Sequence, residues 1–340
     1  MTLVLTHGGC FDGYCAYVIA RNALADQVCY YYGLQPSDLV PQLERLFGDL
    51  QQQGVALATM RLRAFDLSFS PEALRLCEQH CGDVQIYNHH QSTLDRFQGA
   101  ALPKNVCVDL ERSGARLAWD YYHAGESAPP LVAYIEARDL WQFERVADAR
   151  AITDVLYATL QPYGFEADSE NLRHWTELLH RADAADFALI LASAPMLQRV
   201  KQLQIESALR KGATRRWHVQ GVDGELRVFV INSDTHISDL GHAALAQLDE
   251  AGARRHDLAL IWFWHERKRR FKASLRSCAA SPANAAQLAA RFGGGGHRNA
   301  AGFWADDTAF LRETSVFPRD APRWPWIALL LGVAGIVLLK

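Results

Sequence analysis

The seven cysteines of this 340-residue chain form no C-x-x-C pair, and their number is odd. We therefore interpret them as reduced thiols of a cytosolic protein. Cys77 and Cys81 lie four residues apart in a predicted helix. For two cysteines at this spacing we favour a structural role over a metal-binding pair. The cysteines by themselves therefore predict neither a disulfide framework nor a metal site.

The chain also has little net charge, no internal repeat and no charged leader. Its formal net charge of −3 excludes a generally basic coat for nucleic acid, so a polyanion would have to be held by a local patch or by metals. With 49% hydrophobic and 21% charged residues, the composition is that of a soluble globular protein, and the length suggests two domains or one large one. A strand is predicted at once, at Leu3–Thr6, so we expect no signal peptide.

One long uncharged run stands near the end, where residues 324–339 are followed only by Lys340. As a helix this run would rise about 24 Å, short of a hydrocarbon core of about 30 Å. Two tryptophans at its start and Arg319 and Arg323 before it are typical of an interfacial anchor with a positive-inside flank. We expect the tail to anchor a cytoplasmic body to a membrane; a buried terminal helix or docked tail is the alternative.

Strand and helix patterns alternate over residues 1–140. Serine caps are predicted before the helices that begin near Pro71 and Gly114. Such alternation indicates βαβ units and a mainly parallel sheet. The predicted strands are Leu3–Thr6, Gln27–Tyr32, one within Val55–Asp66, Val84–Asn88 and Asn105–Asp109.

From Pro129 to about Trp217 the pattern is helical, without a convincing strand, and ends in a long stretch that could link two lobes. Strands return afterwards. The predicted fold class is α/β and two-lobed: a mainly parallel N-terminal sheet flanked by helices, a helical connector, and a smaller C-terminal α/β domain. The predicted limits are 1–190, 191–216 and 217–312, with 324–339 as a membrane helix.

A first candidate site lies in Thr6–Gly13, where a strand turns into a helix. His7 and Asp12 on this glycine-rich turn can converge on one ion, and the glycines allow close approach of the backbone to a phosphate. Asp12 as a simple helix cap is the alternative.

Three further segments carry imidazole or carboxylate. Asp66 ends a strand, where capping of a helix is the alternative role. His89 and His90 follow another strand, where the alternative is a surface pair without a role. For Asp139 the alternative is a structural pair with Arg138. Ligand crevices of open α/β sheets lie at such strand ends. Together with the first turn, these residues form a ligand set for Mn²⁺ or a similar ion, which suits attack of water on phosphorus.

A fifth candidate lies in the glycine-rich run of residues 291–303. Bare backbone N–H groups and the side chains of His297 and Arg298 are typical of a phosphate cradle, with a flexible linker as the alternative. Arg276, at the end of a predicted strand, is the best phosphate contact among the nearby basic residues. The predicted substrate-binding residues are thus Arg276, Gly294, Gly295, Gly296, His297 and Arg298.

Over roughly residues 3–305 these motifs resemble the DHH phosphoesterases that carry a DHH-associated C-terminal domain, the RecJ-like and oligoribonuclease-like proteins. Residues 7–13 are similar to the first motif of the family, Asp66 to its second, residues 87–92 to the Asp-His-His motif, and Arg138–Trp141 to the segment with the last metal ligand. The resemblance implies metal binding by His7, Asp12, Asp66, His89 and Asp139, with His90 and Asn88 as catalytic residues. It also implies Mn²⁺ as cofactor, as one or two ions, with Mg²⁺ or Co²⁺ as alternatives.

Two departures from the family pattern stand in the site. Cys10 stands near the place of an aspartate of the first motif; we interpret it as a buried or inert thiol, with an unusual metal ligand as the alternative. Asn88 replaces the aspartate of the Asp-His-His motif and loses the charge that would make its histidine more basic. We predict hydrolysis of phosphodiester bonds in short single-stranded oligonucleotides or small nucleotides. The alternatives are an inactive nucleotide-binding sensor and a 3′,5′-bisphosphate nucleotide phosphatase.

Overall fold

The computed structural model describes residues 1–36, 38–97, 101–160, 169–181, 183–218 and 225–313. The chain divides into two compact units. The first comprises Met1–Ser207 together with Gly293–Arg298, and the second comprises Ala208–Phe292 with the residues from Asn299 onward. The predicted domain limits remain predictions, and the two units are described separately below.

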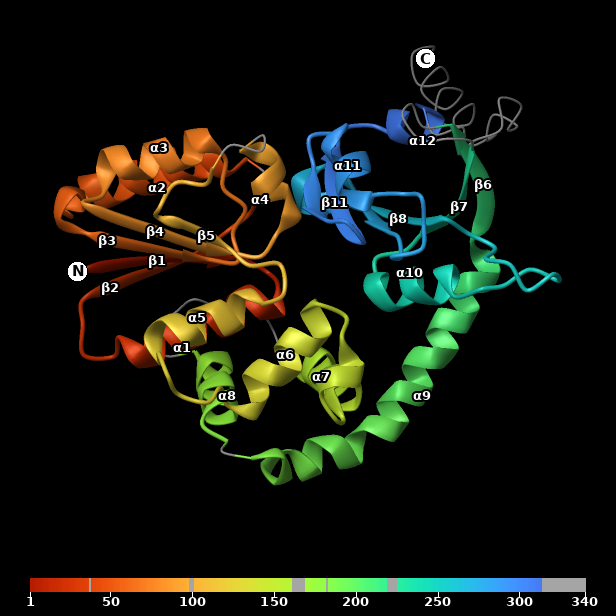
Figure 1. Cartoon of the computed structure of the whole chain (residues 1–340), viewed down its shortest axis with the longest axis horizontal. Helices are drawn as coiled ribbons and strands as arrows, with labels where there is room; N and C mark the ends of the chain where they lie inside the picture. The colour runs from red at the N-terminus through yellow and green to blue at the C-terminus, as the bar shows by residue number, and fades with distance from the viewer. Residues whose placement is uncertain (37, 98–100, 161–168, 182, 219–224, 314–340) are drawn as a thin grey trace, which may run out of the picture. The chain divides into compact units, whose positions relative to one another are not determined.

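The first unit is built on a five-stranded sheet in which every neighbouring pair is parallel (Figure 1). This confirms the predicted α/β fold with a parallel sheet. The strand order is β2-β1-β3-β4-β5. The strands are β1 (Thr2–His7), β2 (Cys29–Leu34), β3 (Arg61–Phe65), β4 (Asp83–Asn88) and β5 (Val106–Val108).

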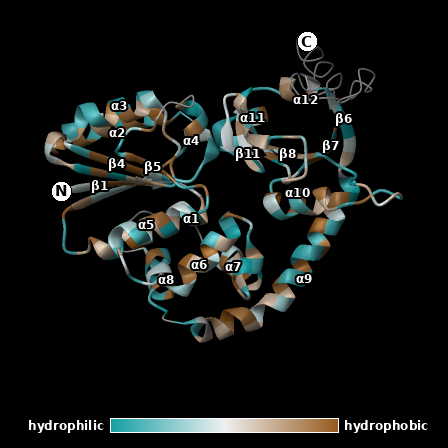
Figure 2. Ribbon diagram, viewed as in Figure 1, coloured by the Kyte–Doolittle hydropathy of each residue, from teal (hydrophilic) through white to brown (hydrophobic). Residues whose placement is uncertain are grey.

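Helices cover both faces of this sheet, and each face has its own apolar core. Leu3 and Leu5 of β1 pack with one set of helices, while Val4 between them packs with the other, as side chains alternate along a strand. Figure 2 shows both hydrophobic (brown) and hydrophilic (teal) residues along these strands. The first core is formed with α2 (Leu39–Gln52) and α3 (Pro71–His80), and the second with α1 (Phe11–Ala23), α5 (Gly114–Tyr122), α6 (Pro130–Asp139), α7 (Ala149–Thr159) and α8 (Glu170–Leu179).

The order of the strands reverses between β1 and β3, because the chain leaves β1 toward β2 and then returns to the other side of β1. In doubly wound sheets, ligands bind outside the carboxyl ends of the strands at this switch point. His7 is the last residue of β1, and Asp66 directly follows β3. The topology therefore places both side chains at the edge where a ligand site is expected.

A buried ion cluster ties the helices of the first unit together. Asp154 of α7 accepts hydrogen bonds at 2.7 Å from both Arg138 of α6 and Lys201 of α9 (Ala188–Lys211). Gln198 of α9 donates to the other carboxylate oxygen at 3.2 Å. The two cations hold the pKa of Asp154 below its usual value although burial alone would raise it. α9 is the predicted helical connector.

The second unit contains a mixed sheet in the order β11-β9-β8-β7-β6. Its core lies between this sheet and α11, where Leu260, Leu275 and Leu288 are buried. The strands are β6 (Ala213–His218), β7 (Glu225–Asn232), β8 (Leu258–His265), β9 (Arg270–Arg276) and β11 (Ala300–Ala305); the helices are α10 (Ile237–Leu245), α11 (Ala285–Ala290) and α12 (Ala309–Glu313). The short strand β10 (Gly295–His297) lies in the stretch that belongs to the first unit. The short helix α4 (Gln91–Arg96) of the first unit follows β4.

Part of the sequence-based description was wrong. The segment to Trp217 was expected to be helical throughout, but residues 213–218 form β6, an antiparallel edge strand beside β7. Most residues of β6 are polar, and only Trp217 is buried. The strand therefore carries little of the apolar signal by which strands are recognised in a sequence. The glycine run, predicted as a phosphate cradle, contains the short strand β10 and leads into β11.

The predicted membrane tail, residues 324–339, lies outside the described residues. Among the helices that the structure describes, none combines the length and the apolar composition needed to span a bilayer.

Asp154→Asn tests the ion cluster. Removing one partner of a buried ion network leaves uncompensated charge, so we expect a loss of about 3 kcal/mol in the free energy of unfolding at neutral pH. Since the folded-state pKa of Asp154 is lowered, its contribution is present above the ordinary pKa of about 3.9 and is lost as the pH falls through the lowered value. Urea unfolding of both proteins across this range measures the difference.

The matched control is Asp120→Asn, which removes the exposed pair between Asp120 and Arg116 of α5. Such a surface pair contributes less than about 0.5 kcal/mol. Equal stability changes in the two variants, or a difference that does not shrink in acid, would contradict a stabilising role for the buried cluster.

Candidate metal centre

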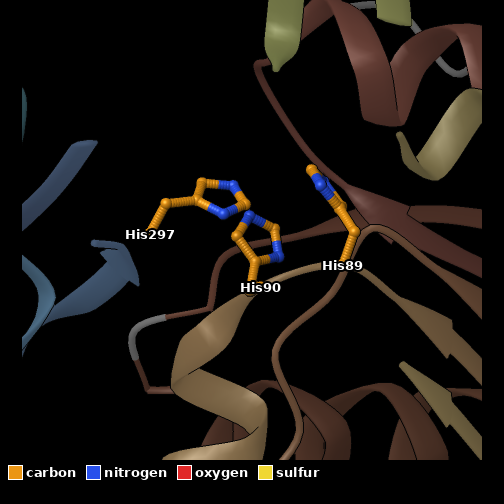
Figure 3. A group of neighbouring side chains, drawn as sticks. All are labelled: His89, His90 and His297. Atoms are coloured by element: carbon orange, nitrogen blue, oxygen red, sulfur yellow. The ribbon is translucent and has the colours of Figure 1, made fainter. Parts of the chain in front are cut away.

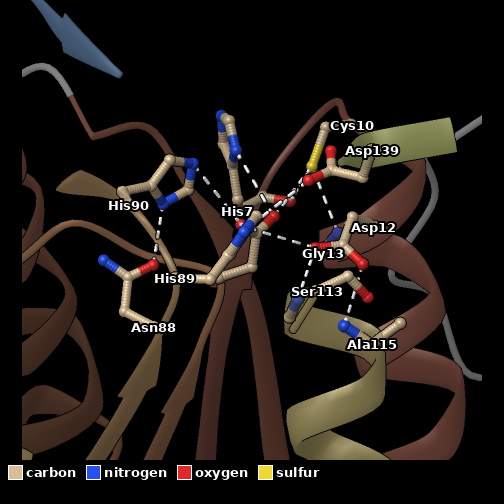
Figure 4. Close-up of polar contacts among 12 residues, drawn as sticks. His7, Cys10, Asp12, Gly13, Asn88, His89, His90, Ser113, Ala115 and Asp139 are labelled. Atoms are coloured by element: carbon tan, nitrogen blue, oxygen red, sulfur yellow. Dashed lines mark hydrogen bonds and ion pairs between the residues drawn. The ribbon is translucent and has the colours of Figure 1, made fainter. Parts of the chain in front are cut away.

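Five segments that are far apart in the sequence bring their polar side chains together at the carboxyl edge of the first sheet (Figure 4). Three of them are strand ends, at β1, β3 and β4, and two are helix ends, at α1 and α6. The structure thus gathers all five residues that were predicted to bind metal: His7, Asp12, Asp66, His89 and Asp139.

Asp66 lies at the centre of the cluster and is almost completely buried. Its backbone has a φ of 58°, in the left-handed region, which costs a residue with a side chain on the order of 1 kcal/mol. Burial would raise the pKa of this carboxyl, but hydrogen bonds with His7 and His89 hold it well below its usual range. Asp66 is therefore an anion at neutral pH.

The two oxygens of Asp66 face different groups of side chains. Oδ2 lies 3.6 Å from His7 Nδ1 and 3.1 Å from Cys10 Sγ. Oδ1 lies 2.9 Å from His89 Nε2, which is also 3.4 Å from Asp12 Oδ2. We name His7, Cys10 and Asp66 the cysteine triad, and Asp12, Asp66 and His89 the aspartate triad; in each, the potential ligand atoms lie within 4.8 Å of one another.

Asp12 is held in place by the start of α5. The backbone N–H groups of Gly114 and Ala115 donate to its two oxygens at 2.6 and 2.9 Å. Such N–H groups have no partner within their own helix and carry the positive end of its dipole. Ser113 caps α5 through the N–H of Arg116, which leaves the first two N–H groups for Asp12. Asp12 is thus not a cap of its own helix; Cys10 occupies that position.

His89 is fully buried and its Nε2 faces three carboxylates, including Asp139 Oδ2 at 3.6 Å. Burial alone would lower the pKa of this imidazole, but Asp12, Asp66 and Asp139 raise it well above its usual value. Its Nδ1 is buried and has no hydrogen-bond partner in the part of the chain that the structure describes. The carboxylates of this cluster therefore attract a positive charge strongly, and a proton on His89 supplies one in the absence of a cation.

His90 has a different environment, as expected for adjacent residues after a strand. Its Nδ1 lies 2.7 Å from Oδ1 of Asn88, which orients the ring, and its Nε2 lies 3.7 Å from Asp66 Oδ1. The Asn88 amide nitrogen in turn donates to Thr93. Because Asn88 Oδ1 can only accept, Nδ1 of His90 carries the proton and Nε2 is the free base. Burial and the neighbouring His89 and His297 hold the pKa of His90 well below its usual value.

The predicted substrate residues are placed differently. His297, in the stretch Gly293–Arg298 of the first unit, lies with its ring centroid 4.8 Å from that of His89 and 4.6 Å from that of His90 (Figure 3). Gly294, Gly295 and Gly296 precede it, and Arg298 follows β10 in an exposed turn. Arg276 belongs to the second unit, where its guanidinium donates to Leu275 O and Ser238 Oγ, both at 2.9 Å.

The donor set fits a divalent cation. Among the residues that the structure describes, Asp12 and Asp66 are paired only with histidines, a thiol and backbone N–H groups. Buried carboxylates without a permanent cationic partner are unfavourable unless a metal or a proton compensates them. Imidazole and carboxylate are the ligands that Mn²⁺ accepts. The residues of the aspartate triad, with Asp139, can thus hold such an ion.

Two parts of the site were not predicted from the sequence. The backbone N–H groups of Gly114 and Ala115 carry no residue-type signal, although the serine cap and the glycine after it marked a helix start. Cys10 was interpreted as a buried or inert thiol, with an unusual metal ligand as the alternative, and its contact with Asp66 was not foreseen.

Gly114→Ala tests how Asp12 is held. A Cβ at Gly114 would collide with Asp66 Cβ and lie 2.9 Å from Asp12 Oδ2, so both carboxylates would have to move. We expect the affinity for Mn²⁺, measured by calorimetry, to fall at least about tenfold, since outer partners of metal ligands typically contribute about 10–100-fold. The matched control is Gly48→Ala in α2, where an added Cβ meets nothing within 4 Å. Unchanged affinity in Gly114→Ala would contradict this account.

Comparison with known proteins completes the description. No family model matches the chain. It is 25% identical over 312 residues to the uncharacterized protein R106 of Acanthamoeba polyphaga mimivirus; the match covers 88% of this chain and 66% of R106, so the chain spans just under two thirds of that protein. Among solved structures, the exonuclease RecJ bound to manganese is 17% identical with a TM-score of 0.46, covering 94% of this chain and 92% of RecJ. A pGpG-specific phosphodiesterase of Vibrio cholerae is 15% identical with a TM-score of 0.41, covering 93% and 97%. At these values the function has to be argued from the site itself.

Proposed function

We propose that the chain is a metal-dependent phosphoesterase that hydrolyses phosphodiester bonds of short oligonucleotides or of a related small nucleotide. The observation that carries the proposal is the position of Asp66, whose two oxygens face two separate groups of potential metal ligands at the switch point of the sheet. A carboxylate shared in this way suits two cations, and paired cations favour in-line displacement at phosphorus. The proposed metal ligands are His7, Asp12, Asp66, His89 and Asp139.

A divalent cation at these ligands would activate water near neutral pH and polarise a phosphoryl oxygen. The residues of the chain prepare the site for it. The start of α5 fixes Asp12, and burial keeps bulk water from weakening the charges of Asp12 and Asp66. Mn²⁺ is the proposed ion, present once or twice, with Mg²⁺ or Co²⁺ as alternatives.

His90 is the proposed catalytic side chain, positioned by Asn88. With its proton on Nδ1 toward Asn88, His90 keeps a free Nε2 next to the cluster. A neutral imidazole can contact a phosphoryl group or hold a proton without adding charge to the ground state. The position of Asn88 preserves the orienting hydrogen bond of the family motif but not the negative charge.

The proposed substrate contacts are Arg276, Gly294, Gly295, Gly296, His297 and Arg298, through phosphate or sugar. A short single strand or a small nucleotide remains the expected ligand. The cytoplasmic location and the membrane-anchoring tail remain predictions as well.

Asn88 favours a second candidate, a nucleotide-binding sensor with little catalysis. Without the negative charge that raises histidine basicity, His90 is a weaker base, and second-shell losses of this kind cost about 10–100-fold. Saturable nucleotide binding without turnover across several metals would establish this alternative. For a 3′,5′-bisphosphate phosphatase, the released product would be inorganic phosphate rather than a mononucleotide.

Asp66→Ala is the direct test of the phosphoesterase. We expect Mn²⁺-stimulated release of mononucleotides from short oligonucleotides to fall at least about 1,000-fold, as when one member of a catalytic unit is removed. Asp120→Ala, in an exposed pair, is the matched control and should retain activity. Intact activity in Asp66→Ala would refute the assignment; thermal unfolding without metal checks that the variant folds.

Asn88→Asp tests whether the replaced aspartate weakens the enzyme. The new carboxylate can accept from both His90 and the Thr93 hydroxyl, so its geometry fits while it makes His90 more basic. We expect the turnover number to rise about tenfold or more. Asn88→Ala, which removes the partner of His90, should lower it. A drop in both variants would show that the amide is required as it stands.

A further inference from the structure

The two triads that share Asp66 differ in chemistry. The aspartate triad offers one imidazole and carboxylate oxygens, with Asp139 nearby. The cysteine triad offers one imidazole, one carboxylate oxygen and the sulfur of Cys10, which lies 3.1 Å from Asp66 Oδ2. His7 and Cys10 are only partly buried, whereas the three members of the aspartate triad are buried. The cysteine triad is therefore the more solvent-accessible of the two.

Helix capping does not explain why residue 10 is a cysteine. Cys10 is the N-cap of α1, and its Sγ accepts a hydrogen bond from the N–H of Gly13 at 3.1 Å. Serine, aspartate and asparagine perform this task better, because oxygen is the stronger acceptor. The same sulfur also donates to Asp66, whose other oxygen belongs to the aspartate triad. Sulfur at this place is therefore directed at the shared carboxylate as well as at the helix.

Thiolate ligands change which ion a site prefers. Cysteine selects zinc and other thiophilic ions, whereas carboxylate and water suit Mn²⁺ and Mg²⁺. On binding a cation the thiol would release its proton to solvent, and the sulfur–metal interaction would replace its hydrogen bond to Asp66. Two adjacent sites with one shared carboxylate would then prefer different metals.

We propose that Cys10 is a metal ligand, and that the cysteine triad is selective for a thiophilic divalent cation such as Zn²⁺ while the aspartate triad takes Mn²⁺. The proposal rests on the proposed metal-dependent function of this site and specifies its metals. Cys10 thereby supplies the donor that the missing aspartate of the first motif would have supplied, but its sulfur prefers softer, thiophilic cations.

Co²⁺ binding followed by absorption spectroscopy tests this without using activity. In the full chain, the Co²⁺ complex should show a sulfur-to-cobalt charge-transfer band in the near ultraviolet. The band should be lost in Cys10→Ser and Cys10→Asp but kept in Cys107→Ser, the matched control, because Cys107 is an exposed thiol on β5. In competition calorimetry, Cys10→Asp should also reduce the preference for Zn²⁺ over Mn²⁺ at least about tenfold.

The outcomes separate this proposal from the proposed function. Co²⁺ binding with ligand-field bands but no Cys10-dependent charge-transfer band would overturn the role of Cys10 and leave the metal site intact. Failure of the wild-type protein to bind Co²⁺, Zn²⁺ or Mn²⁺ would overturn the metal site itself. Cys10→Ser keeps an N-cap for α1, so loss of the band in this variant cannot be ascribed to loss of the helix start.

Discussion

Two buried carboxylates without a lysine or arginine partner, among the described residues, are the constraint on which the rest of the site depends. Buried carboxylates are unfavourable unless other groups compensate them. The N–H groups at the start of α5 and the histidines are the groups that contact these two. The fold delivers these groups to one edge, because the carboxyl ends of parallel strands lie together and the order of the strands reverses between β1 and β3.

Asp66 makes the cluster one unit rather than several neighbouring ions. Its Oδ1 contacts His89 and its Oδ2 contacts Cys10. A cation bound at one oxygen would therefore reduce the negative charge that the carboxylate offers to a cation at the other oxygen. His90 stands apart in function, because Asn88 orients it and its surroundings keep it neutral. A central anion beside a neutral imidazole is the physical basis for assigning metal binding to one histidine of the pair and a catalytic role to the other.

The sequence predicted the parts of this arrangement that leave a periodic or residue-type signal. The parallel sheet followed from apolar runs separated by helical patterns, and the meeting of five polar side chains at one edge followed from their positions at strand and helix ends. β6 escaped prediction because an edge strand with polar outward residues has almost no apolar period. The role of Gly114 in holding Asp12 escaped because it is made by backbone N–H groups, which every residue except proline has. Long-range contacts such as Cys10 to Asp66 appear only once the strands are aligned.

Anomalous diffraction from crystals soaked in Mn²⁺ and Zn²⁺ together, with data at the manganese and zinc edges, tests the central claim most directly. It counts the ions and names their ligands in one measurement. The account predicts anomalous density beside each of the two oxygens of Asp66, with zinc enriched on the side of Cys10. Absence of any anomalous density next to Asp66 in well-soaked crystals would contradict it.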